Sequence, residues 1–207
     1  VAYEYFSNDT EYEVVAFAVE EQFLGKSPAR LFDLPVVAFE SLDETYPSQY
    51  YSAFVAITYT KLNRVRTRLY ALLKQNGYQL ASYISPSAFI APTTSIGDNC
   101  FIFEDNTIQP FTCIGNNVIL WSGNHIGHHS KIGNNCFISS HVVISGSCKL
   151  GDNVFMGVNS TVHDSIDIGD YALIGAGAIV SKNVKDKVVL SPLSTPVFPK
   201  NSDEINF

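Results

Sequence analysis

The sequence predicts a mainly β protein in which a parallel β-helix of six-residue repeats follows a small α/β domain. Three observations predict this fold class. A large aliphatic side chain or Met stands at every sixth position from Ile84 to Val180, without an insertion. Turn-forming triplets recur between these positions, as in GDN at 97–99 and GNN at 115–117. Before Ile84 the period of six is absent, and short apolar runs precede a helical pattern.

Residues 1–82 are predicted to form the α/β domain. Compact apolar runs, typical of buried parallel strands, occupy 12–19, 34–39 and 51–58. A helical pattern follows at 61–78, and its apolar face consists of Leu62, Val65, Leu69 and Leu72. Strands alternating with a helix predict a parallel, Rossmann-like sheet. Because 1–82 contain no Gly-rich phosphate-binding turn, we expect this domain to be incomplete at its N-terminus.

Residues 83–186 carry the repeat. Side chains alternate along a strand, so each ladder residue and the residue two before it face inward, and the next three residues make a corner. A chain that turns a corner every six residues and stacks at about 4.8 Å per coil is a parallel β-helix. The ladder consists of Ile84, Ile90, Ile96, Ile102, Ile108, Ile114, Leu120, Ile126, Ile132, Ile138, Ile144, Leu150, Met156, Val162, Ile168, Ile174 and Val180.

Polar and thiol side chains also occupy inward positions. Asn106 and Asn124 are three repeats apart, so they stack in neighbouring coils, and we interpret them as a ladder of amides bonded to each other. Three cysteines read as small core residues, namely Cys100, Cys136 and Cys148. Two coils separate Cys100 from Cys136, roughly 9 to 10 Å, which is beyond disulfide reach. Unpaired thiols are typical of a reducing compartment.

The net charge and the hydropathy of the chain argue against several classes of function. The net charge is −7, and no run of Lys or Arg indicates binding to nucleic acid or to an anionic membrane surface. No apolar stretch approaches the ~18 residues of a membrane-spanning helix, and no signal peptide is visible. A cytoplasmic location is therefore expected. Residues 187–207 are rich in Pro and Ser and are predicted to form an irregular arm or lid.

Histidines concentrate in NHIGHHSKIG, at 124–133, which contains three of the five in the chain. The repeat places His128 and His129 in one corner and His141 in another, while His125 points outward from a strand. Corners recur on the same edge only at every third repeat, so His128 and His141 lie on different edges of one prism. They can meet only across an interface between subunits.

The combination NHIGHHSKIG with ISSHVVISG, followed by NVFMGVNSTVHDSIDIGDYALIGAGAIVSKNV, resembles a known enzyme family. It is similar to the hexapeptide-repeat sugar acyltransferases of the sialic-acid O-acetyltransferase and bacillosamine-pathway N-acetyltransferase type. The resemblance implies a left-handed, three-sided helix that assembles as a homotrimer. It also implies acetyl-CoA as donor and a sugar acceptor, nucleotide-linked and destined for a surface polysaccharide, with the front domain binding the nucleotide sugar.

The resemblance also assigns residues. His128 matches the general base of the family and His141 matches a second histidine, whereas His129 stands where the family has an acidic residue that orients the base. Trp121 replaces an Asn of the family. The residues that match the acetyl-CoA site are Gly157, Val158, Gly175 and Ala176, with Lys182 as a candidate ligand of the CoA phosphates. No metal is expected.

Two alternative functions remain open at the level of the sequence. γ-Class carbonic anhydrases bind zinc through three histidines on the same fold, and His125, His128 and His141 are the corresponding candidates here. The other alternative is a β-solenoid that binds a partner without catalysing a reaction, because a fold alone does not fix an activity.

Overall fold

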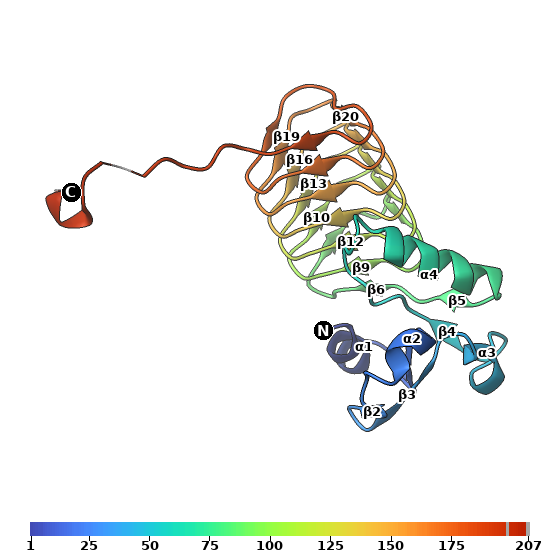
Figure 1. The fold of residues 1–207 in the computed structure, drawn as a ribbon. Coiled ribbons are helices and arrows are strands. Elements are labelled where there is room, and N and C mark those ends of the chain that lie inside the picture. The colour runs from blue at the N-terminus through green and yellow to red at the C-terminus, as the bar shows by residue number, and fades with distance from the viewer. Residues whose placement is uncertain (198, 206–207) are drawn as a thin grey trace.

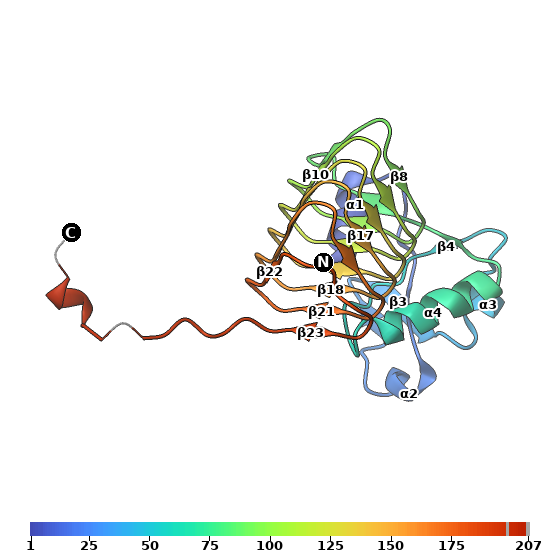
Figure 2. The same ribbon diagram turned by 90° about the horizontal axis from the view of Figure 1, so that it is seen from above.

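A computed structural model describes residues 1–197 and 199–205. Residues 83–190 wind into a three-sided prism of stacked coils, and the N-terminal helices and strands lie against its first coils (Figure 1). Seen from above, the prism has a triangular cross-section, and helix α4 lies beside it on the side away from the C-terminal arm (Figure 2). The repeat therefore forms the body of the molecule.

Three parallel sheets form the faces of the prism. The six-strand face contains β7 (Phe89–Ile90), β10 (Thr107–Ile108), β13 (His125–Ile126), β16 (Val143–Ile144), β19 (Thr161–Val162) and β22 (Ile179–Val180). The five-strand face contains β8 (Ser95–Ile96), β11 (Cys113–Ile114), β14 (Lys131–Ile132), β17 (Lys149–Leu150) and β20 (Asp167–Ile168). The seven-strand face contains β6 (Tyr83–Ile84), β9 (Phe101–Ile102), β12 (Ile119–Leu120), β15 (Phe137–Ile138), β18 (Phe155–Met156), β21 (Leu173–Ile174) and β23 (Val189–Leu190).

Corners between the faces define three edges of the prism. Edge I joins the seven-strand and six-strand faces and comprises the corners 103–105, 121–123, 139–141, 157–159 and 175–177. Edge II joins the six-strand and five-strand faces and comprises the corners 109–111, 127–129, 145–147, 163–165 and 181–183. Edge III joins the five-strand and seven-strand faces and comprises the corners 97–99, 115–117, 133–135, 151–153 and 169–171.

The register confirms the ladder predicted from the sequence. Neighbouring strands pair residues that are three repeats apart, as when Ile108 lies between Ile90 and Ile126. The ladder side chains are buried along the length of the prism, except at the first coil, where Ile84 is 41% exposed. After Val180 the register changes, because Ile174 pairs with Leu190, two positions short of three full repeats. The final coil is thus shorter than the others.

The interior contains the expected cysteines and amides, but the two inward asparagines do not bond to each other. Asn106 Nδ2 donates to the carbonyls of Phe103 and Trp121, both at 2.9 Å. Asn124 Nδ2 also donates to the Trp121 carbonyl, and its Oδ1 accepts the Val142 N–H at 2.8 Å. Carbonyls at a corner lie outside the strand ladder, so an inward amide bonds to them instead of to another amide. The four cysteines are free thiols, of which only Cys113 is exposed.

The N-terminal part forms two small sheets rather than one continuous Rossmann-like sheet. Helix α1 (Ala2–Asp9) precedes a sheet in which β3 (Leu34–Ala38) pairs in parallel with β1 (Phe17–Val19) and antiparallel with β2 (Arg30–Leu31). Short helices α2 (Glu21–Leu24) and α3 (Leu42–Thr45) lie within this region, and a 3₁₀ helix (Ser202–Glu204) lies in the C-terminal arm. The second sheet pairs β4 (Ser52–Ala53) with β5 (Gln79–Leu80) around α4 (Arg64–Gln75), a single βαβ unit.

The predicted strand at 51–58 is shorter than expected because Arg66 of α4 takes its carbonyls. Arg66 is 1% exposed, and its guanidinium donates to the Val55 carbonyl, to the Ile57 carbonyl at 3.0 Å and to the Asn99 carbonyl at 2.8 Å. Burial lowers the pKa of Arg66 to about 9. No carboxylate pairs with this guanidinium among the described residues. Its backbone bonds hold α4 and the 54–58 segment on the prism.

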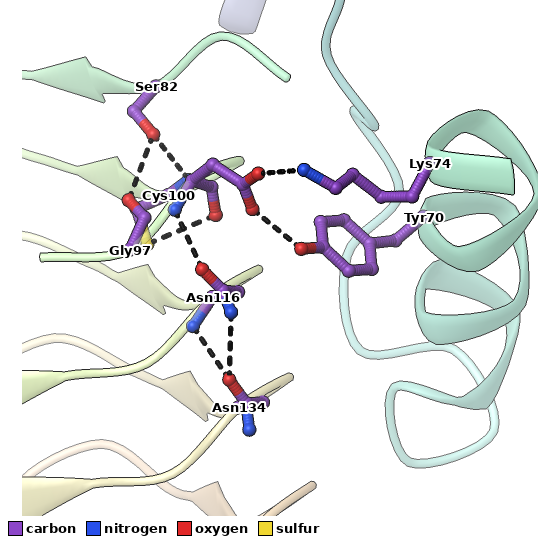
Figure 3. Close-up of polar contacts among 8 residues, drawn as sticks. Tyr70, Lys74, Ser82, Gly97, Cys100, Asn116 and Asn134 are labelled. Atoms are coloured by element: carbon purple, nitrogen blue, oxygen red, sulfur yellow. Dashed lines mark hydrogen bonds and ion pairs between the residues drawn. The ribbon is translucent and has the colours of Figure 1, made fainter. Parts of the chain in front are cut away.

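Edge III completes the attachment of α4. Tyr70 Oη donates to Asp98 Oδ1 at 2.6 Å, and Lys74 Nζ lies 2.7 Å from Asp98 Oδ2 (Figure 3). Beyond Asp98, asparagine side chains cap the corners of the next coils, since Asn116 Oδ1 accepts the Asp98 N–H at 3.0 Å and Asn134 Oδ1 accepts the Asn116 N–H at 2.9 Å. The amide ladder of this protein therefore runs along edge III. The polar side chains of edge III are therefore occupied by hydrogen bonds within the fold.

Candidate active site

His128 and His129 occupy one corner of edge II. His128 Nδ1 lies 3.0 Å from His129 Nδ1, and the two rings are nearly perpendicular, at 86°. The His128 N–H donates to Gln109 Oε1 at 2.9 Å, which fixes the start of the corner. His129 adopts the left-handed conformation, φ 59°, and its ring lies 4.8 Å from that of Phe111 in the preceding coil. The contact between the two imidazoles is exposed.

Gly146, one coil after His128, makes room for the imidazole. A Cβ on Gly146 would lie 2.7 Å from His128 Cε1 and 2.9 Å from Nε2. Asp164 Oδ1 would lie 3.3 Å from that Cβ, and it accepts the Gly146 N–H at 2.9 Å. The His128 ring thus lies directly over the main chain of Gly146. This glycine was not predicted from the sequence, although a glycine three repeats after a corner histidine is a detectable signal.

His141 lies on edge I, and a glycine also makes room for its ring. Gly123, φ 75°, lies one coil before it, and a Cβ there would be 2.5 Å from His141 Nδ1. Only a residue without a Cβ combines this φ with this contact. Consecutive corners after His141 on the same edge carry the predicted acetyl-CoA residues, namely Gly157, Val158, Gly175 and Ala176. A Cβ on Gly157 would lie 2.4 Å from the Ala176 nitrogen, so these two corners stack closely.

The three edges differ in how the backbone N–H groups of their middle corner residues are capped. On edge III the N–H of the middle corner residue is capped by a side chain, as at Asn134, where Asp152 Oδ1 accepts it at 2.7 Å. On edge II the N–H groups of His128 and Gly146 are capped likewise, whereas those of Asp164 and Lys182 have no acceptor among the described residues. On edge I, within the described part of the chain, the N–H groups of Val158 and Ala176 have no acceptor. Edge I therefore presents donors to whatever lies against it.

The structure separates the predicted site residues into two groups. His141 and the four acetyl-CoA residues share edge I, whereas His128, His129 and Lys182 share edge II. Lys182 lies three coils beyond His128 and is exposed. The six-strand face lies between the two edges, so a single chain does not bring His128 to His141, as the spacing predicts.

The six-strand face has no Asp, Glu, Lys or Arg among its outward residues, and no other part of the described chain packs on it. Its outward residues are Phe89, Thr107, His125, Val143, Thr161 and Ile179. Ile179 is 71% exposed and Phe89 is 59% exposed. The five-strand face, in contrast, presents Lys131, Lys149 and Asp167 outward, and the N-terminal part packs on the seven-strand face. A face of apolar, Thr and His side chains thus separates the two groups of site residues.

One chain does not assemble a metal centre from the candidate histidines. Among residues 1–197 and 199–205, no three His, Cys, Asp or Glu side chains gather closely enough to hold a metal ion. His125, His128 and His141 lie on a face and on two different edges, so they are apart within one chain. No helix in the described residues is both long and apolar enough to cross a bilayer.

Comparisons with known proteins agree with this architecture. Residues 111–146 match the family described as bacterial transferase hexapeptide (six repeats), and residues 148–182 match the hexapeptide repeat of succinyl-transferase. No curated protein is a significant sequence match. The predicted repeats are confirmed at these positions.

Solved structures share the fold over most of the chain. A mutant of perosamine N-acetyltransferase from Caulobacter crescentus, in complex with CoA and GDP-perosamine, is 21% identical, with a TM-score of 0.75 over 86% of this chain and 92% of that chain. The acetyltransferase domain of PglB from Neisseria gonorrhoeae is 18% identical, with a TM-score of 0.74 over 84% and 94%. WeeI from Acinetobacter baumannii is 23% identical, with a TM-score of 0.55 over 91% and 87%. The predicted fold class, a left-handed parallel β-helix behind a small α/β part, is confirmed.

Proposed function

We propose that this hexapeptide-repeat β-helix is an acetyl-CoA-dependent acyltransferase that acts on a nucleotide-linked sugar, as a homotrimer in the cytoplasm. One observation carries the proposal: the two edges that flank the six-strand face carry different groups, which together would supply the base and the donors that an acyl transfer needs. Edge II presents an imidazole, and edge I presents glycine corners with unpaired N–H groups. Solved structures of the same fold contain CoA and GDP-perosamine, which supports this donor and this acceptor class.

Threefold symmetry brings the two halves together. When three prisms turn the same face toward a common axis, edge I of each one meets edge II of the next. The six-strand face suits that position because its most exposed residues, Phe89 and Ile179, are apolar and none of its outward residues is Asp, Glu, Lys or Arg. The cleft between two subunits then contains His128 of one chain and the His141 edge of the other.

The donor fits along edge I. Pantetheine contains two amide groups, and free N–H groups on successive coils, about 4.8 Å apart, are matched donors for its carbonyls. Val158 and Ala176 supply these groups where Gly157 and Gly175 keep the main chain open. Lys182, on edge II of the adjoining subunit, is our candidate cation for the CoA phosphates. A donor N–H at this edge also stabilises the thioester oxyanion.

The base chemistry requires no covalent enzyme intermediate. His128 Nε2 accepts the proton of the sugar amine or hydroxyl while that atom attacks the thioester carbonyl carbon. The tetrahedral intermediate collapses, the carbon–sulfur bond breaks, and the thiolate of CoA takes the proton from His128. A neutral imidazole suits both steps because it exchanges a proton near pH 7. We propose that His141, on the facing edge, contacts the same acceptor.

An activity assay tests the proposal. Purified protein is mixed with acetyl-CoA and a panel of UDP-, GDP- and dTDP-linked sugars that carry either a free amine or only hydroxyls. Release of the CoA thiol and the mass of the product identify the acceptor atom. We expect His128→Ala to reduce turnover by at least about 100-fold with an unchanged melting temperature. Failure of millimolar acetyl-CoA to bind or to raise the melting temperature would contradict the proposal and favour the non-catalytic alternative.

Subunit complementation tests the shared site. His128→Ala and His141→Ala should each be inactive as homotrimers. After mixed refolding, about a quarter of the sites should combine a wild-type edge I with a wild-type edge II, and activity should return to a matching level. The control is Ile179→Glu, which places a charge on the six-strand face and should yield folded, inactive monomers, whereas Lys149→Glu on the five-strand face should leave the trimer intact. A wild-type protein that is monomeric by light scattering would refute the arrangement.

A further inference from the structure

We propose that His129 is the positioning residue of the base, and that its ring nitrogen Nδ1 accepts the Nδ1–H of His128. This inference rests on the proposed function. It follows from the contact between His128 Nδ1 and His129 Nδ1, 3.0 Å apart, with the rings at 86°. Two ring nitrogens at this distance form a hydrogen bond only if one carries the proton and the other presents a lone pair.

The direction of that hydrogen bond decides whether His128 can act. If His128 Nδ1–H donates, the lone pair of His128 is on Nε2, where it can take a proton from the acceptor sugar. If His129 donates, His128 carries its proton on Nε2 and is not a base at that nitrogen. The proposed function requires the first direction, because only this tautomer leaves a lone pair on His128 Nε2, above the Gly146 corner. His129 is exposed, so its own Nε2–H can donate to water.

The surroundings hold His129 in this role. Its ring packs on that of Phe111 at 4.8 Å, and its N–H donates to the Pro110 carbonyl at 3.1 Å. Asp164 is the acidic group at the Gly146 corner, but its Oδ1 accepts the Gly146 N–H at 2.9 Å, and it forms no ion pair with His128. Its Oδ1 is therefore engaged by the corner. His129 is the group that contacts His128 Nδ1.

Proton accounting is consistent with a neutral partner. When His128 Nε2 takes the proton of the acceptor, His128 becomes an imidazolium and still donates Nδ1–H to the lone pair of His129. His129 neither gains nor loses a proton. The proton on Nε2 then passes to the departing thiolate, and the pair returns to its starting state. Because His129 is uncharged, it stabilises the imidazolium less strongly than a carboxylate would.

Two variants separate this role from a structural one. His129→Phe removes the lone pair but keeps a ring against Phe111, and Phe fits the corner because Phe111 itself has φ 61° at the equivalent position. His129→Asp restores an acceptor as a carboxylate. We expect His129→Phe to lower kcat about 10- to 100-fold with the KM for acetyl-CoA and the melting temperature unchanged, and His129→Asp to recover most of the loss. Asp164→Asn is the comparison variant and should retain the wild-type kcat.

¹⁵N NMR of the labelled protein without substrate measures the tautomer of His128 directly. This test can therefore be made before the acceptor sugar is known. We expect neutral His128 to carry its proton on Nδ1 in the wild type and to shift toward Nε2–H in His129→Phe. An unchanged tautomer in His129→Phe, or an unchanged kcat in an enzyme that is otherwise active, overturns the role of His129 and leaves the acyltransferase proposal standing. Absence of all turnover with a normal tautomer instead counts against the proposed function.

Discussion

Replacement of Gly146 by Ala tests the placement of the base without touching the base itself. The new Cβ would lie 2.7 Å from His128 Cε1 and 2.9 Å from Nε2. Carbon contacts are stable at about 3.5–4.0 Å, so the imidazole must move by about 1 Å. A misplacement of about 1 Å costs on the order of 100-fold in rate. That factor corresponds to about 2.7 kcal/mol of transition-state stabilisation.

The fold should tolerate the same change. Gly146 does not have a positive φ, and the atoms that the methyl group meets first belong to the end of an exposed side chain. Alanine also restricts the unfolded chain, so the free energy of unfolding should stay within about 1 kcal/mol of the wild type.

Steady-state kinetics with acetyl-CoA and the acceptor from the panel, together with thermal unfolding, measure the two effects. Gly25→Ala is the matched control, because nothing lies within 4 Å of its Cβ. If Gly146→Ala keeps kcat within a few-fold of the wild type, or loses activity only together with its fold, the placement of His128 over this corner is not what the reaction requires.

Three further predictions concern the rest of the molecule. Alkylation of the native protein at pH 8 should modify only one of the four thiols, the exposed Cys113, as measured by mass spectrometry. Burial raises the pKa of Cys100 to about 11 and that of Cys136 to about 12, so these thiols should not react. Labelling of a second thiol before unfolding would contradict the packed interior. Arg66→Met should lower the free energy of unfolding by about 3–5 kcal/mol in a urea titration, because it leaves several buried carbonyls without a donor. The control Arg68→Met changes an exposed residue and should lower that free energy by less than about 1 kcal/mol. Ile126→Ala should cost about 2–5 kcal/mol and Ile84→Ala much less, because Ile126 is fully buried and Ile84 is 41% exposed; equal losses would argue against a ladder that is open at its first coil.

The repeat made the prism predictable because one rule governs every coil. A side chain that recurs at every sixth position determines which residues face inward, and a three-sided coil of three repeats then determines which strands pair. Ile108 opposite Ile126 follows from the sequence with no further information. The exception is the final coil, where Ile174 pairs with Leu190, and no ladder residue marks the loss of two positions.

Features that depend on contacts between distant segments were not predictable in this way. The bonds of Arg66 to Val55, Ile57 and Asn99 shorten a strand that its own apolar run predicts to be longer. Asn106 bonds to corner carbonyls because they are close in space, and its spacing from Asn124 did not reveal them. Both cases involve a polar side chain that satisfies backbone groups outside a regular ladder.

The candidate site was predictable in its residue types and in their division between edges, since a period of three repeats places His128 and His141 on different edges. The spacing also places a glycine three repeats from each of these histidines, at Gly123 and Gly146. What the spacing does not give is the direction in which each imidazole points, so the contact of each ring with its glycine was seen only in the structure.

The shortened last coil also affects whether copies of this chain can stack end to end. An open end of a parallel solenoid offers unpaired strand edges, which invite the next copy to add on and extend a fibre. Here β20 is followed only by the Ile168 to Val184 bridge, β21 is covered by β23, and within the described residues β22 has no strand beyond it. Because both continuing pairs are two residues short of three repeats, a second copy with regular coils would meet this end out of register, which opposes end-to-end stacking.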